Sequence, residues 1–279
     1  MIIAIASGKG GTGKTTVAVN LALSIENAQL LDFDVEEPND NIFLKTEFTD
    51  EEDIQIDIPK IDFEKCDFCG KCADFCMYNA LAVVKDNVLV FSDLCHSCGG
   101  CRLVCPQKAI SWDKKTIGKI QHGVYKNKLD FFQGILNIGE AMAVPLLKEL
   151  KKKIDKNKNV ILDAPPGTSC PVIETIQESD YCILVTEPTL FGLHDLKLTV
   201  DVMRNLKIPF GVIINRDGVG DKQVEQYCQR EKIEIILRIP HSEKIAELYS
   251  DGQTFYDKLP DWKENFIKLY NKLKTEVYK

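Results

Sequence analysis

Gly8-Lys9-Gly10-Gly11-Thr12-Gly13-Lys14-Thr15-Thr16 is the stretch that decides the fold of this chain. It follows a short apolar run, Met1 to Ala6, and precedes an amphipathic run, Thr16 to Ile25, which predicts strand, glycine loop and helix in that order. Glycines let backbone N–H groups turn toward an anion, and the helix N-terminus adds partial positive charge. We expect Lys14 to contact the outer phosphates of a nucleotide and the Thr15 hydroxyl to bind Mg²⁺. The alternative, a flexible glycine turn, is disfavoured by the complete pattern at a strand end.

Composition limits the classes of protein that the chain can belong to. Its 279 residues are 44% hydrophobic and 28% charged, which is ordinary for a globular protein. A net charge of −7 argues against nucleic acid as a partner bound by general phosphate attraction. No apolar run approaches a membrane span, and the first residues lack the features of a signal peptide, so we expect a cytoplasmic protein.

The rest of the chain, apart from one cysteine-rich segment, alternates short apolar strands with amphipathic helices. This pattern predicts an α/β fold with a mostly parallel sheet covered on both faces. We expect strands at 29–33, 160–162, 181–186, 210–215 and 233–239, and helices at 142–154, 193–206, 222–231 and 242–249.

Polar side chains stand at the ends of several of these strands, where parallel sheets bind ligands. Asp163 is placed to hold Mg²⁺ together with Thr15. Asp32 and Asp34 form a second carboxylate pair, one to complete the metal shell and one to orient the attacking water. Capping of a helix or turn is the alternative role of this pair. Asn215 is expected to bind the edge of the nucleotide base.

The glycine loop and these strand ends resemble the MinD/ParA/Mrp group of P-loop ATPases. Lys9 stands where the group carries a signature lysine that reaches the phosphates of a facing subunit, so the resemblance implies an ATP-dependent homodimer. It implies that Asp34 is the water-orienting aspartate of switch I and that Asp163-Ala-Pro-Pro-Gly-Thr168 is switch II. Asn215 and the Ile239-Pro240 turn match the adenine-binding region.

Under this resemblance the nucleotide is ATP or ADP with Mg²⁺, and the catalytic residues are Lys9, Lys14 and Asp34. The nucleotide-binding residues are Gly8, Gly10, Gly11, Thr12, Gly13, Lys14, Thr15, Thr16 and Asn215, and the Mg²⁺ ligands are Thr15, Asp32 and Asp163.

Cysteines dominate the segment from Pro59 to Ser111, which repeats itself. Cys66-Asp-Phe-Cys69-Gly-Lys-Cys72-Ala-Asp-Phe-Cys76 returns as Cys95-His-Ser-Cys98-Gly-Gly-Cys101-Arg-Leu-Val-Cys105. This spacing is typical of bacterial ferredoxins, in which the fourth cysteine of each run binds the other cluster. We therefore expect two [4Fe–4S] clusters, one bound by Cys66, Cys69, Cys72 and Cys105, the other by Cys95, Cys98, Cys101 and Cys76. Zinc is the rival metal, but paired C-x2-C units alone do not explain the third and fourth cysteines.

The predicted organisation is an ATPase domain, residues 1–58 and 116–279, interrupted by a ferredoxin-like α+β domain, residues 59–115. The acidic run from Val35 to Asp57 is expected to be solvated surface. Residues 261–279 predict an amphipathic helix that packs on its own domain, with contact to a membrane surface as the alternative. Cys170 follows the switch II-like loop and is expected to be a free thiol, although the related nitrogenase iron protein uses such a cysteine for a shared cluster.

The combination resembles MinD-superfamily ATPases that carry an inserted ferredoxin domain. We expect nucleotide state to be coupled to electron transfer through two clusters, toward an unidentified redox partner protein. Two alternatives stay open: a carrier or assembly ATPase for iron–sulfur clusters, and a MinD-like positioning ATPase whose clusters sense redox state.

Overall fold

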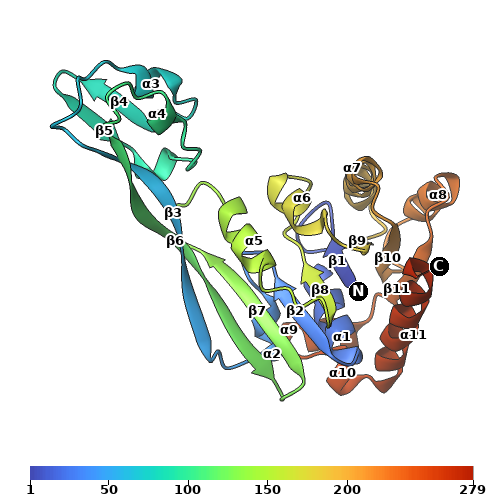
Figure 1. The fold of residues 1–279 in the computed structure, drawn as a ribbon. Helices are drawn as coiled ribbons and strands as arrows, with labels where there is room; N and C mark the ends of the chain where they lie inside the picture. Colours follow the sequence, from blue (N-terminus) through green and yellow to red (C-terminus); the bar gives the residue numbers. More distant parts are fainter. Residues whose placement is uncertain (279) are drawn as a thin grey trace.

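A nine-stranded sheet forms the centre of the computed structural model, which describes residues 1–278 (Figure 1). The strand order is β11-β10-β9-β1-β8-β2-β7-β6-β3. Strands β11 to β7 pair in parallel, whereas β7, β6 and β3 pair antiparallel. The predicted α/β fold with a mostly parallel sheet is therefore confirmed.

The parallel strands are short and buried, as expected for a sheet covered by helices. They are β1 (Ile2–Ala6), β2 (Ala28–Asp32), β7 (Leu129–Leu136), β8 (Asn159–Asp163), β9 (Tyr181–Thr186), β10 (Phe210–Asp217) and β11 (Ile235–Pro240). Successive residues of β1 serve opposite faces: Ala4 and Ala6 join one apolar core, Ile3 and Ile5 the other.

Helices cover both faces. One face carries α5 (Val144–Lys151), α6 (Cys170–Ile176), α7 (Leu190–Leu206) and α8 (Gln223–Arg230). The other face carries α1 (Lys14–Ser24), α2 (Asp40–Leu44), α9 (Glu243–Ser250), α10 (Phe255–Lys258) and α11 (Pro260–Val277).

A long antiparallel ribbon leaves the sheet and ends in a small separate unit (Figure 1). It consists of β3 (Asp50–Ile61) and β6 (Ile110–Tyr125), paired from Asp50 opposite His122 to Ile61 opposite Ile110. Residues 50–53 are exposed, as predicted for the acidic run, but the expectation missed that this run forms a strand. Its acidic groups pair with basic groups across the ribbon: Glu51 with Lys119 and Asp57 with Lys114.

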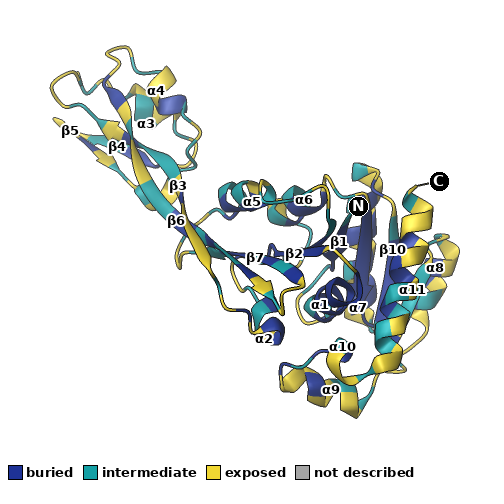
Figure 2. Ribbon diagram, turned by 60° about the horizontal axis from the view of Figure 1, so that its bottom comes forward, coloured by how far each residue is buried: buried dark blue, intermediate teal, exposed yellow. Residues whose placement is uncertain are grey.

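Residues 62–109 form the unit at the end of the ribbon, hereafter the cysteine unit. It contains α3 (Lys71–Phe75), a hairpin of β4 (Leu81–Val84) and β5 (Asn87–Val90), a 3₁₀ turn (Ser92–Leu94) and α4 (Gly100–Leu103). Figure 2 shows that buried residues concentrate in the main sheet, while the cysteine unit has few. Strands β3 and β6 run without a break through 58/59 and 115/116, so the division at these positions stays a prediction.

The C-terminal helix packs on the chain itself. The predicted helix 261–279 appears as α11, and Lys279 lies outside the described residues. Phe266, Leu269, Tyr270 and Leu273 are buried in the core that α1 shares. This arrangement favours packing over membrane contact, because the apolar face is already covered. Within residues 1–278, no helix is both long and apolar enough to cross a bilayer.

Candidate functional site

The loop between β1 and α1 has the backbone of a phosphate cradle. Gly11 and Gly13 adopt φ angles of 79° and 93°, which favour glycine. The Asn215 side-chain amide donates a 2.8 Å hydrogen bond to the Thr12 carbonyl oxygen. A Cβ on Gly13 would lie 2.3 Å from that amide nitrogen, so this contact also requires glycine. Sequence positions 12 and 215 thus meet at the predicted site.

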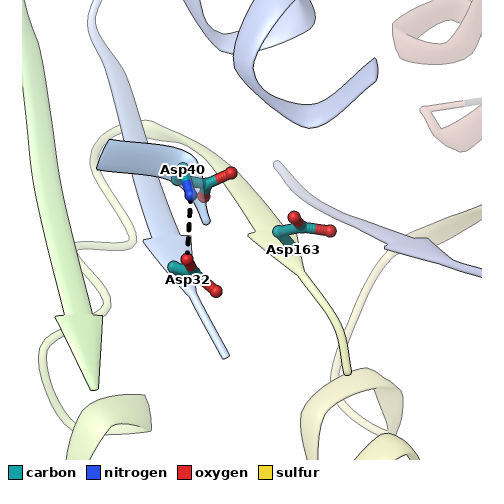
Figure 3. A group of neighbouring side chains, drawn as sticks. All are labelled: Asp32, Asp40 and Asp163. Carbon is teal, nitrogen blue, oxygen red and sulfur yellow. Dashed lines mark hydrogen bonds between the residues drawn. The ribbon is translucent and has the colours of Figure 1, made fainter. Parts of the chain in front are cut away.

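Three buried carboxylates gather beside the cradle, two predicted and one missed. The Thr15 hydroxyl donates a 2.7 Å hydrogen bond to Asp163 Oδ2 at the end of β8. Asp32, at the end of β2, accepts hydrogen bonds from the backbone N–H groups of Asp34, Asn39 and Asp40 at 2.9–3.2 Å. The third carboxylate belongs to Asp40, the first residue of α2 (Figure 3).

One oxygen from each of Asp32, Asp40 and Asp163 lies within 4.8 Å of the other two. All three side chains are fully buried or nearly so. Burial, and then the nearby charge of Asp163, raise the pKa of Asp32 well above its usual value. Burial and the Asp32 charge do the same to the pKa of Asp40. Oxygen donors of this kind suit Mg²⁺ or another hard divalent cation.

Asp34 and Lys9 occupy the borders of the site. Asp34 is half-buried, and burial raises its pKa to about 6 against the opposing charge of Lys14. Asp34 also lines a cavity formed with switch II-like prolines, Pro165 and Pro166. Lys9 forms a 3.6 Å ion pair with the buried Glu187, which also binds Arg216 at 2.7 Å.

A second cavity opens on the other side of the glycine loop, where a nucleotide base would follow the phosphates. Asn215 and Pro240 both line this cavity, and their role in binding adenine stays a prediction. Other lining residues come from the glycine loop, α1, the segment after β10, α9 and α10, including Gly13, Thr16, Val219, Ile245 and Phe255.

The cysteine unit brings the eight predicted cysteines into two groups. Cys66, Cys69, Cys72 and Cys105 line one small cavity. In the other group, burial, together with smaller contributions from the nearby Cys95 and Cys98, raises the pKa of Cys101 to about 11. Burial also raises the pKa of Cys95, and the nearby Cys76 and Cys98 contribute in the same direction. Each group therefore contains cysteines from both sequence repeats, and the assignment of each group to an iron–sulfur cluster stays a prediction.

Backbone donors support the sulfurs at equivalent places in the two repeats. The N–H of Ala80 donates to Cys76 Sγ, and that of Ala109 to Cys105 Sγ, both at 3.3 Å. Such donors stabilise thiolate sulfur, as in iron–sulfur sites. Cys69 and Cys98, the second cysteine of each run, are exposed.

The other three cysteines lie outside these groups. Cys182 and Cys228 are buried in the apolar core, as expected for structural residues. Cys170 is exposed at the first position of α6, next to Pro171. It forms no disulfide in this single chain, and its role as a free thiol stays a prediction.

Two residues near the site, Asp40 and Lys115, were not predicted from the sequence. Asp40 belongs to no motif, and it is held beside Asp32 by α2, which packs against α1, and by the hydrogen bond from its own N–H to Asp32. Lys115 donates to Asp93 at 2.8 Å and pairs with Glu140 at 2.9 Å, linking the cysteine unit to the loop after β7. Neither residue shows a spacing signal, because their partners are distant in sequence.

Comparison with known proteins agrees with this geometry. The family described as CobQ/CobB/MinD/ParA nucleotide binding domain matches residues 3–255. An uncharacterized protein of Methanocaldococcus jannaschii is 34% identical over 273 residues, which cover 91% of both chains. An iron-sulfur cluster carrier protein of Pyrococcus horikoshii is 26% identical, covering 98% of this chain and 86% of its own.

A solved structure shows the same fold. It is the septum site-determining protein MinD of Pyrococcus horikoshii in complex with Mg-ADP, with a TM-score of 0.59 and 20% identity. The match covers 98% of this chain and 95% of that one. The family match covers most of the chain and agrees with the glycine loop and the strand-end carboxylates. The chain therefore belongs to the CobQ/CobB/MinD/ParA family of nucleotide-binding proteins.

Proposed function

We propose that this chain is an ATP-hydrolysing carrier of iron–sulfur clusters, in which the nucleotide site governs clusters held by the cysteine unit. The observation that carries the proposal is the presence of two four-cysteine groups in a unit that the β3–β6 ribbon joins to the sheet of the nucleotide cradle. Strand β3 follows the segment that contains Asp32 and Asp40, so a change at the carboxylates has a direct covalent route to the cysteines.

The nucleotide half of the proposal rests on family membership and local chemistry. We assign ATP or ADP with Mg²⁺ to the cradle, with Lys14 on the phosphates and Thr15 and Asp163 toward the ion. Asp34 is assigned to orient the attacking water. Lys9 is assigned to the phosphates of a facing subunit in an ATP-dependent homodimer, since its side chain is one-third exposed.

The cluster half assigns one [4Fe–4S] group to each set of cysteines. The first set is Cys66, Cys69, Cys72 and Cys105, and the second is Cys76, Cys95, Cys98 and Cys101. In each set the ligands surround the group while backbone N–H groups stabilise their sulfurs. The ferredoxin-like boundaries, 59–115, belong to this proposal.

The names of similar proteins favour cluster delivery over electron transfer as the function of this chain. Several of them are named iron-sulfur cluster carrier proteins, among them one of Pyrococcus abyssi at 26% identity. The exposure of Cys69 and Cys98 supports the same reading, since acceptor thiolates have access to one ligand of each group. The sequence analysis had ranked electron transfer higher.

The test is transfer from the reconstituted chain to an apo-protein under anaerobic conditions. The loaded protein is mixed with apo-aconitase, whose activity returns only when a [4Fe–4S] cluster arrives. We expect activity to return, and to return more slowly from a Cys69→Ser and Cys98→Ser double variant. Full retention of the clusters by the wild type would overturn the carrier proposal.

Electron transfer to a redox partner protein is the second candidate, favoured by the mixed origin of each cysteine set. Each group takes cysteines from both repeats, so the two groups share the same two chain segments, as in two-cluster ferredoxins. Retained clusters whose EPR spectrum and potential change with MgATP would support this candidate instead.

A further inference from the structure

The buried group of Asp32, Asp40 and Asp163 contains more negative charge than the nucleotide site requires. Their carboxylates come from the end of β2, the start of α2 and the end of β8, and Figure 3 shows them side by side. Their exposed fractions are 0%, 0% and 1%. Three carboxylates that share one buried space repel one another unless a cation or protons neutralise them.

The protein's own donors satisfy only part of this group. Three backbone N–H groups bind Asp32, and Thr15 binds Asp163 Oδ2. No N–H or O–H group of the described residues donates a hydrogen bond to either oxygen of Asp40 or to Oδ1 of Asp163, although the Asp40 and Asp163 carboxyl groups lie within hydrogen-bonding reach of each other. Among residues 1–278, no Lys, Arg or His nitrogen lies within 4.0 Å of these three carboxylates, although the Lys14 charge acts on Asp40 and Asp163 from further away.

Two simpler explanations account for some of these facts. Asp32 caps the segment before α2, which explains its three N–H contacts but leaves Asp40 unexplained. A proton shared between Asp40 and Asp163 would reduce the repulsion, and it would leave the remaining carboxylate oxygens unbound. A hard divalent cation instead uses one oxygen from every member, because these oxygens already lie within 4.8 Å of one another.

We infer that Asp32, Asp40 and Asp163 bind one divalent cation of the Mg²⁺ or Mn²⁺ class before any nucleotide arrives. In P-loop NTPases generally, a loop Ser or Thr and a single Walker-B-type aspartate hold the ion together with the nucleotide phosphates. Here Asp40 completes a set of three protein carboxylates, so the phosphates are not needed to hold the ion. The inference deepens the proposed nucleotide site and is independent of the cysteine unit.

One consequence concerns the segment from Asp32 to Asp40. An ion bound to both of its ends and to Asp163 ties this segment to β8 in the nucleotide-free protein. Nucleotide then arrives at a site whose cation is already in place, and Thr15 exchanges its Asp163 contact for the ion.

The test measures Mn²⁺ binding to the full chain after removal of metal and nucleotide, using the EPR signal of free Mn²⁺. We expect one Mn²⁺ per wild-type chain. In Asp40→Asn the affinity should fall at least about tenfold, because even outer-shell partners of metal ligands are worth 10–100-fold. Asp57→Asn, which alters only a surface pair with Lys114, should bind like the wild type.

Two results would overturn the inference: no Mn²⁺ bound by the nucleotide-free wild type, or equal affinity in Asp40→Asn. Binding of Mn²⁺ together with ATP is measured in parallel. If that complex forms while the nucleotide-free protein binds nothing, the inference fails and the proposed nucleotide site survives. Thermal unfolding shows whether Asp40→Asn is folded. If it is not, the wild type decides alone: failure of Mn²⁺ to raise the unfolding temperature of the nucleotide-free wild type contradicts the inference.

Discussion

Lys9 and Lys14 lie on the same loop but have different surroundings. Lys14 is 7% exposed and its charge acts on Asp34 and Asp163. Lys9 reaches Glu187 across a loose 3.6 Å pair and keeps a third of its side chain in solvent. Glu187 is buried, but Arg216 also pairs with it at 2.7 Å, so Glu187 keeps a cationic partner when Lys9 leaves.

We therefore expect Lys9→Ala to lose nucleotide-dependent dimerisation and to keep nucleotide affinity within about threefold, since the cradle is built by other groups. Light scattering after size-exclusion chromatography, with a non-hydrolysable ATP analogue, measures the oligomeric state. Lys14→Ala is the contrasting variant and should lose nucleotide binding itself. A Lys9→Ala protein that still dimerises with nucleotide would contradict the assignment of Lys9.

Site residues could be predicted from the sequence where they belong to a motif or follow an apolar strand. The glycine loop, Thr15 and Asp163 carry a continuous motif or a strand-end position, and the structure brings them together. Asn215 was predicted from its place at the end of β10. Asp40 carries neither signal, because it is held beside Asp32 only when α2 packs against α1.

Among the elements, the ribbon of β3 and β6 connects the two functional regions. Lys115 on β6 binds Asp93, two residues before Cys95, and Glu140 in the loop after β7. Glu140 lines the same cavity as Asp34 and Pro165. The Lys115 ammonium therefore connects the segment before Cys95 to the loop after β7, which shares a cavity with Asp34 and Pro165. The Lys115 side chain is only 16% exposed.

We expect Lys115→Met to uncouple the cysteine unit from nucleotide. In the loaded wild type, hydrogen exchange of residues 92–105 should change when MgATP binds, and this change should disappear in the variant. ATP affinity should be unaltered. Lys114→Met is the matched control, because Lys114 on the same strand pairs only with Asp57 among the described residues. A full nucleotide response in Lys115→Met would contradict the link.

The C-terminal helix makes a separate prediction about stability. Phe266 is fully buried where α11 packs on the core shared with α1. Phe266→Ala should destabilise the chain by about 3–5 kcal/mol, because it removes a large side chain and leaves a cavity. Lys268→Ala, on the exposed face, should change stability by less than about 0.5 kcal/mol. Denaturant unfolding measures both; equal stability of the two variants would mean that α11 does not pack as described.

The elements also show why part of the fold was missed. Strands of the parallel sheet were predictable because their apolar runs are short, continuous and bounded by helices. The ribbon was not recognised, although Ile54, Ile56 and Ile58 alternate with polar residues as strand residues do. Its many charges suggested solvent, and they do lie in solvent, but cross-strand pairing with the lysines of β6 stabilises the strand.

For the whole molecule, the two regions differ in how they are stabilised. The sheet has a large apolar core on each face, whereas the small core at the cysteine unit is formed by the buried residues Leu81, Val88 and Cys101 together with Ile110 of β6. So small a core stabilises a unit of this size poorly without metal.

Removal of the clusters should therefore unfold the cysteine unit before the sheet. Limited proteolysis should cut the chelated protein within residues 62–109 much faster than the loaded protein, while the fragments from the sheet stay intact. Equal cleavage rates for the loaded and chelated forms would show that the unit folds independently of metal.

If nucleotide controls the clusters, the rate of cluster transfer must depend on nucleotide. Loaded wild type and loaded Lys14→Ala are each mixed with apo-aconitase, with and without MgATP. We predict that MgATP changes the wild-type rate severalfold and leaves the Lys14→Ala rate unchanged. The same wild-type rate with and without MgATP would contradict the account.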